Sequence, residues 1–212
     1  SYARDDDGNV ASTSASMTNG TLETVQDVWA GEDWGDDYEG AEAYQDTFIE
    51  ADRGNAYSEA SDADRNVART EASMTNGTLE TLQGAWAVED WGDNFEVAQA
   101  YQITFIEADH GTATSHARDD DGNFANTSAT MTNGTLLTYQ GAWAVEDWGD
   151  DYEGAEAYQD TLIEADRGTA SSSALDDDGN FANTSASMTN GTLLTYQGAW
   201  AVEDRGDNFE GV

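Results

Sequence analysis

The chain has 212 residues, with no cysteine and no proline. Its 44 acidic residues far outnumber its seven arginines, and the formal net charge of -37 excludes nucleic acid as a partner, because phosphates would be repelled. The lack of cysteine excludes a disulfide framework and thiolate metal sites. No apolar run is long enough to span a membrane, and an aromatic content of 10% favours a folded protein over a disordered one.

An internal repeat organises the whole chain. The hexapeptide MTNGTL begins at Met17, Met74, Met131 and Met188, so the sequence repeats every 57 residues without insertion or deletion. Such periodicity is typical of proteins that stack identical units. We expect one continuous stacked domain made of three full repeats and one partial repeat, at residues 1–57, 58–114, 115–171 and 172–212.

The first predicted element of each repeat is an acidic turn. It reads DDDGN at residues 5–9, 119–123 and 176–180, a composition found in calcium-binding loops. It lacks the spacing and the final glutamate of an EF-hand, and the second repeat has DADRN at 62–66, so a solvated turn remains the alternative. The candidate Ca²⁺ ligands are Asp5, Asp7, Asn9, Asp119, Asp121, Asn123, Asp176, Asp178 and Asn180. No other cofactor is expected.

The second element is an Asn-Gly pair at 19–20 and at the equivalent place in every repeat, which is a strong hairpin signal. The same asparagines begin N-x-Thr triplets, the acceptor sequence for N-glycosylation in extracellular proteins. The candidate glycosylation sites are Asn19, Asn76, Asn126, Asn133, Asn183 and Asn190. If one repeat forms three rungs, the Asn19 series should recur about every 14 Å along one face.

A shorter period of 19 residues follows, since VQDVWAGEDWG at 25–35 aligns with YQDTFIEADRG at 44–54. Three columns stay apolar at this step. One holds Ala, Leu or Val from Ala3 and Leu22 onward, and a second holds Ala or Ile from Ala11 and Ala30 onward. The third contains most of the large residues, and we expect it to form a stacked core ladder. Its members are Val10, Trp29, Phe48, Val67, Trp86, Phe105, Phe124, Trp143, Leu162, Phe181 and Trp200.

These patterns predict an all-β fold. Stretches such as NTSATMT at 126–132 are rich in strand-forming residues, and no helical period of 3.6 is present. Each 19-residue unit is expected to hold two short strands and two turns, with three units in each 57-residue repeat. Two architectures fit this arithmetic, a β-solenoid with 19-residue rungs or a continuous β-meander.

An enzyme is not expected. The chain has only two histidines, His110 and His116, and neither recurs in the other repeats. Carboxylates are abundant, but none forms a unique cluster that would mark a catalytic pair.

The open end of a β-stack presents unpaired backbone groups that recruit other chains. We therefore expect an extracellular structural protein whose partners are copies of itself, forming a fibre, tube or sheath by β-edge pairing. Divalent cations and glycans are the further expected partners. The alternative is a segment of a calcium-dependent cell-surface adhesin.

The repeat style also suggests a family. With MTNGTLETVQDVWAGEDWG at 17–35 and AYQDTFIEADRG at 43–54, the chain resembles the acidic repeat proteins on the surface of filamentous methanogenic archaea. The likeness extends over the whole chain. It implies a glycosylated sheath or extracellular fibre with amyloid-like β-structure, and it implies no catalytic residues.

Overall fold

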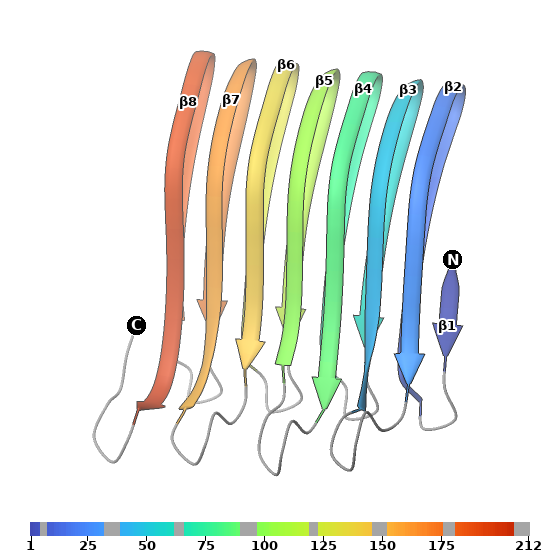
Figure 1. Ribbon diagram of the computed structural model, residues 1–212. Helices are drawn as coiled ribbons and strands as arrows, with labels where there is room; N and C mark the ends of the chain where they lie inside the picture. Colours follow the sequence, from blue (N-terminus) through green and yellow to red (C-terminus); the bar gives the residue numbers. More distant parts are fainter. Residues whose placement is uncertain are drawn as a thin grey trace.

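The computed structural model describes residues 1–4, 8–31, 39–61, 66–89, 97–118, 123–145, 152–175 and 181–205. These residues form eight β-strands: β1 (Tyr2–Arg4), β2 (Val10–Gly31), β3 (Glu39–Ser61), β4 (Val67–Glu89), β5 (Val97–Arg118), β6 (Phe124–Val145), β7 (Tyr152–Leu175) and β8 (Phe181–Arg205). Each strand pairs antiparallel with the next, so one open sheet runs in the order β1 to β8 (Figure 1). The all-β prediction is confirmed, and of the two expected architectures the sheet is the meander.

The predicted 19-residue unit of two short strands is wrong. β2 to β8 are each 22 to 25 residues long, so one 57-residue repeat supplies two long strands. The Asn-Gly pairs do not end strands as the hairpin signal indicated, because β2 continues in register with β3 on both sides of Asn19.

At each Asn-Gly pair the strand bends instead of ending. Asn19, Asn76, Asn133 and Asn190 have φ between 51° and 55°, the left-handed region that asparagine tolerates better than most residues. The ladder skips one residue on each strand here, because Thr18 pairs with Arg53 and Gly20 with Ala51. The skipped residues Asn19 and Asp52 lie at the apex of the bend.

The bend brings the two halves of one strand face to face. The Ser58 hydroxyl donates to Gln45 Oε1 at 3.4 Å although both residues belong to β3, and 13 extended residues would span roughly 40 Å. Figure 1 shows the same arrangement, since each long strand turns over at the upper side of the view and returns behind itself. The open sheet therefore covers its own inner face.

Two layers result, and each contains one half of every long strand. Layer A comprises residues 10–18, 53–61, 67–75, 110–118, 124–132, 167–175 and 181–189, with β1 beside the first of them. Layer B comprises residues 20–31, 39–51, 77–89, 97–108, 134–145, 152–165 and 191–205.

Alternation along each strand decides which side chains lie between the layers. In β3 the buried positions are Ala41, Ala43, Gln45, Thr47 and Ile49 before the bend. They resume at every second residue after it. Alanine fills most of this interior, which allows the two layers to pack closely.

The predicted core ladder is wrong for this reason. Its column lies on the outer faces, and Leu162, Phe181 and Trp200 are 38%, 56% and 44% exposed. The adjacent column of Ala and Ile is the buried one, with Ile49, Ile106 and Ile163 fully covered. An interior lined by alanine leaves no room for indole and phenyl rings.

The interior near the bend is filled by complementary sizes. A Cβ atom added at Gly54 would lie 2.9 Å from Ile49 Cγ2 and 3.0 Å from Met74 Cε. Glycine on β3 therefore makes the space that methionine on β4 occupies. The same arrangement recurs at Gly111, against Ile106 and Met131.

Polar side chains form ladders through the same interior. Gln45, Gln83, Gln102, Gln140 and Gln159 are fully buried at paired positions on successive strands. Several link the two layers directly: Gln45 Nε2 donates to the Ser14 carbonyl at 3.1 Å, and Gln159 Nε2 to the Ser128 carbonyl at 3.0 Å. These bonds tie layer B to layer A.

Candidate assembly edges

The strand β8 forms one edge of the sheet. It pairs with β7 along nearly its whole length, and the described part of the chain contains no strand on its other side. Its side chains are correspondingly open, with Leu194 74% and Tyr196 69% exposed. An unpaired strand of this length offers a row of backbone donors and acceptors to another strand.

This edge also lacks the usual protection. Residues 181–201 contain no charged side chain, whereas the neighbouring β7 carries Glu156, Asp160, Glu164 and Asp166 on its described positions. Natural edge strands normally carry charges, prolines or bulges that discourage further pairing. In a chain with net charge -37, an uncharged edge is the place where a second strand meets least repulsion.

The opposite edge is partly covered. β1 pairs with only three residues of β2, from Val10 to Ser12. Ser1 extends this contact, because its amino group donates to the Thr13 carbonyl at 2.8 Å and its carbonyl accepts from the Thr13 amide at 3.0 Å. Beyond Thr13, the described residues leave the outer side of β2 without a paired strand.

The interior columns are open at this edge. Met17 on β2 is 38% exposed, whereas its equivalents Met74 and Met131 on central strands are 4% and 3% exposed. The difference arises because a glycine-bearing strand flanks each central methionine on both sides, while Met17 has one such neighbour, at Gly54. Adding a strand at the edge would bury the same apolar surface again.

The bends form a ridge that carries four of the predicted sequons. Asn19, Asn76, Asn133 and Asn190 are exposed there on alternate strands, so their spacing is about 9.6 Å and not the expected 14 Å. Three of the amides donate to a carboxylate of the next strand, Asn19 to Asp52 at 2.9 Å, Asn76 to Asp109 at 2.8 Å and Asn133 to Asp166 at 3.0 Å.

The other two sequons lie away from the ridge, on the outer face of layer A. Asn126 is half-buried on β6, and Asn183 is exposed on the edge strand β8. Whether any of the six asparagines carries a glycan stays a prediction.

Most of the candidate Ca²⁺ ligands lie outside the described residues. These are Asp5, Asp7, Asp119, Asp121, Asp176, Asp178 and Asn180. Asn9 and Asn123 are described, and both are fully buried at the residue directly before a strand begins. Among the described residues, no three acidic or histidine side chains converge as a metal site would require. Calcium binding stays a prediction.

The two histidines lie on β5, on the outer face of layer A. His110 is exposed near the ridge, whereas the His116 ring is half-buried and packs edge-on against Phe124, with ring centroids 4.8 Å apart. Burial lowers the pKa of His116 below its usual value, and the positive charges of Arg69 and Arg118 lower it further. No feature of this contact indicates catalysis.

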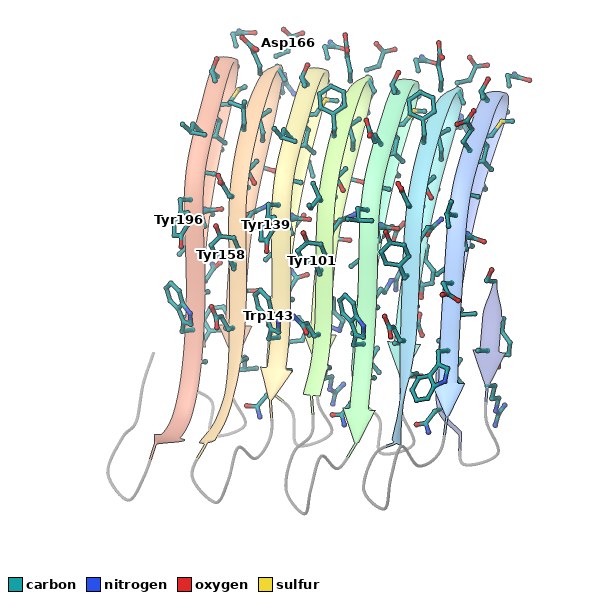
Figure 2. The ribbon with its side chains drawn as sticks, viewed as in Figure 1. Tyr101, Tyr139, Trp143, Tyr158, Asp166 and Tyr196 are labelled. Atoms are coloured by element: carbon teal, nitrogen blue, oxygen red, sulfur yellow. The ribbon has the colours of Figure 1, made fainter. Side chains whose placement is uncertain are left out.

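Sequence reasoning missed a cluster of tyrosines on the outer face of layer B. Tyr101, Tyr139, Tyr158 and Tyr196 pack edge to face across four strands, with centroids 5.1 to 5.5 Å apart (Figure 2). Burial raises the pKa of Tyr101 above its usual value, and the neighbouring Tyr139 contributes. The signal in the sequence was a tyrosine four residues before a column residue, as Tyr139 stands before Trp143, once the outer face is assigned correctly.

No helix in the described ranges is long and apolar enough to cross a membrane. Comparison with protein families, with curated proteins and with solved structures gives no match to this chain.

Proposed function

We propose that this chain is an extracellular structural protein that assembles with copies of itself by pairing of sheet edges. The observation that carries the proposal is the edge strand β8, which is long, unpaired on one side and uncharged over residues 181–201. Each copy has two different edges, β8 and the β1–β2 side. Pairing of unlike edges gives an open-ended fibre or sheath where the rotation between copies does not close a ring.

The distribution of charge supports this direction of growth. Carboxylates project from the outer faces of both layers and from the ridge, where copies placed face to face would repel one another. Edge pairing instead keeps these carboxylates at the strand spacing that they already have within one chain. Added salt should therefore promote assembly, because it screens the repulsion that remains.

Charge placed on the edge tests the proposal. Ser185 and Ser187 are exposed on the layer A half of β8, and changing both to glutamate puts like charges where the next copy would pair. The 57-residue repeat supplies a matched control: Ser128→Glu with Thr130→Glu makes the same change at equivalent positions on the central strand β6. Electron microscopy and sedimentation velocity report the size of the assemblies.

We expect the unmodified protein and the β6 control to form fibres or sheets at high concentration in salt, and the β8 variant to remain small. Circular dichroism of all three proteins checks that the fold is intact. Dispersed monomers of the unmodified protein under all conditions, or equal assembly of the two variants, would contradict edge pairing.

The ridge supports the extracellular assignment. Its four asparagines are exposed, lie in N-x-Thr triplets and recur at a fixed spacing on one side of the molecule. Glycans at these positions would project away from both edges and leave assembly unhindered. The resemblance to surface proteins of filamentous archaea agrees with this placement. Intact-mass measurement of native material tests it, and a mass equal to that of the bare chain would remove the glycans from the proposal.

A further inference from the structure

The outer face of layer B carries a line of aromatic residues that crosses the sheet. Direct register pairs join Tyr44 to Gly84, Gly84 to Tyr101, Tyr101 to Gly141, Gly141 to Tyr158 and Tyr158 to Gly198. Tyrosine and glycine therefore alternate along one row, perpendicular to the strands, from β3 to β8.

Tryptophan rings cover the glycines of this row. A Cβ atom added at Gly84, Gly141 or Gly198 would overlap the six-membered ring of the tryptophan two residues further along the same strand. Glycine at these positions thus lets each indole lie over the backbone. The outcome is a continuous line of six rings on six adjacent strands, which we call the aromatic track: Tyr44, Trp86, Tyr101, Trp143, Tyr158 and Trp200.

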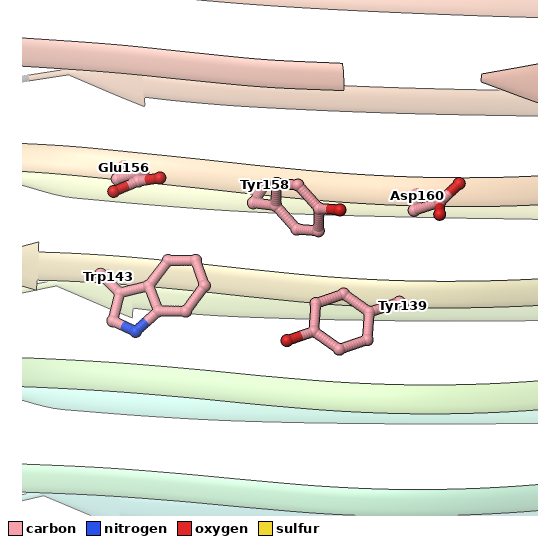
Figure 3. A pocket seen from close by; sticks show the side chains of 5 residues that line it. All are labelled: Tyr139, Trp143, Glu156, Tyr158 and Asp160. Atoms are coloured by element: carbon pink, nitrogen blue, oxygen red, sulfur yellow. The ribbon is translucent and has the colours of Figure 1, made fainter. Parts of the chain in front are cut away.

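The track is accessible and measures about 24 Å, which is five strand spacings. Its end members Tyr44 and Trp200 are 36% and 44% exposed. Figure 3 shows the central part, where the Trp143 indole presents its face to the viewer and Tyr139, which lies beside the track, packs edge to face against Tyr158. A shallow hollow of about 410 Å³ lies over them, bordered by Tyr158, Glu156 and Asp160.

Polar side chains border the track. On one side Glu42, Gln99 and Glu156 pair in register with the tryptophans, and on the other side Asp46 and Asp160 share a row with Leu82, Ile103, Tyr139 and Tyr196. The carboxylates accept hydrogen bonds and donate none. A partner that fits therefore offers donors to these carboxylates, apolar surface to the rings and no negative charge.

We propose that the aromatic track binds a neutral, extended, β-linked polysaccharide that lies across the strands. Each pyranose ring has an apolar face of C–H groups for an aromatic ring and equatorial hydroxyls that donate to flanking carboxylates. Rings recur along the track at one strand spacing, about 4.8 Å, which is comparable to the length of one sugar unit in such a polymer. Tryptophans recur on alternate strands, which matches a polysaccharide with two-fold symmetry, where every second sugar has the same orientation.

Other occupants fit these features less well. A second copy of this chain would bring its own rows of carboxylates against Glu42, Asp46, Glu156 and Asp160, at a net charge of -37 on each partner. The same charge repels nucleic acids and anionic lipid surfaces. The polysaccharide proposal does not depend on assembly, because one copy contains the whole track.

The test uses three soluble neutral probes with β-1,4 linkages: cellohexaose, chitohexaose and xylohexaose. Binding to the full chain is measured by isothermal titration calorimetry and by the change in tryptophan fluorescence. Two variants disrupt the track: the double variant Trp143→Ala with Trp200→Ala, and the single variant Gly141→Ala. The second keeps every aromatic ring but lifts the Trp143 indole off the strand, because the new methyl group occupies its place.

The first repeat provides the matched control. Trp29 is the equivalent of Trp86, but Asp27 stands where the later repeats have glycine, so Trp29 cannot lie over its strand in the same way. Trp29→Ala removes one indole from the same face without shortening the track. Circular dichroism and the melting temperature confirm that each variant is folded.

We expect at least one probe to bind, about tenfold weaker binding in the Gly141→Ala variant and a greater loss in the double variant, with little change in Trp29→Ala. Three results would overturn the proposal: no binding of any probe at millimolar concentration, equal binding by all variants, or equal loss in Trp29→Ala. Sedimentation velocity tests the other candidate occupant of the track, a second copy of this chain. If no probe binds and the double variant loses self-association, the track is a contact between copies.

Discussion

Replacing Asn76 by alanine tests the origin of the bend. Asn76 has a φ of 52°, and its amide donates to Asp109 Oδ2 at 2.8 Å. Alanine in this left-handed conformation costs about 1–2 kcal/mol. The lost hydrogen bond is to a charged group but is exposed to solvent, so it contributes about 1 kcal/mol. The free energy of unfolding should therefore fall by about 2–3 kcal/mol, which lowers the Tm by roughly 4–12 °C for a chain of this size.

Two companion variants separate these contributions. Asn76→Gly retains the left-handed conformation and should lose only about 1 kcal/mol, for the hydrogen bond. Asn190, on the edge strand β8, has a nearly equal φ of 51°, and the described residues provide no following strand with a carboxylate for it. Asn190→Ala should therefore cost only the conformational part, about 1–2 kcal/mol.

Thermal and urea denaturation followed by circular dichroism measure all three variants under the same conditions. The expected order of destabilisation places Asn76→Ala first and Asn76→Gly last. If Asn76→Gly is as destabilising as Asn76→Ala, the bend does not depend on the left-handed conformation. If Asn76→Ala costs no more than Asn190→Ala, the hydrogen bond to Asp109 contributes nothing.

Three further predictions concern the core, the pH dependence and the salt dependence. Ile163→Ala should destabilise the protein by about 2–5 kcal/mol, because Ile163 is fully buried, whereas Leu162→Ala should cost less than about 1 kcal/mol. Equal losses of stability in urea denaturation would instead support the core ladder expected from the sequence, which contains Leu162. Because the pKa of His116 is lowered in the fold, its contribution to stability is complete above its unfolded pKa of about 6.5 and is lost as the pH falls through 6.5 toward the folded pKa. His116→Gln should remove this part of the pH dependence in melting curves, and His110→Gln should leave it; the reverse result would contradict the assignment. About 1 M NaCl, with a screening length near 3 Å, should raise the Tm, and a lower Tm in salt would show that repulsion between carboxylates does not limit stability.

The sequence predicted the class of fold but not the path of each strand. The 57-residue repeat, the absence of a helical period and the strand-rich composition were enough to predict an all-β stack. The Asn-Gly pair was misleading, because its preference for the left-handed region serves a bend within a strand as well as a hairpin turn. Local conformation is the same at the asparagine in both cases, and only the pairing of Thr18 with Arg53 distinguishes them.

The core was misassigned because large aromatic residues were expected to be buried. The pattern AEAYQDTFI at 41–49 places small or medium residues at every second position and charged or aromatic ones between them. A thin interior between two halves of one sheet selects the first set. The step of 19 hid this alternation. In β2 the side chains that face the interior have odd numbers before the residue skipped at Asn19, as at Ala11, and even numbers after it, as at Ala30. An odd step therefore connects two residues that both face the interior.

The candidate sites depended on the same information. Unpaired edges follow from any open stack and were expected, but the uncharged stretch 181–201 gains its meaning only when β8 is placed at the edge. The aromatic track was not predicted, because its rings come from all four repeats and meet only in the register of the meander.

The distance between equivalent residues three repeats apart tests the architecture most directly. The chain has no cysteine, so Thr18→Cys with Thr189→Cys introduces two unique, exposed attachment sites for spin labels beside the ridge. Six strand spacings separate β2 from β8, and electron paramagnetic resonance should give a distance centred near 29 Å. A distance near 43 Å, which corresponds to nine stacked rungs, would contradict the arrangement of two bent strands per repeat and restore the 19-residue unit.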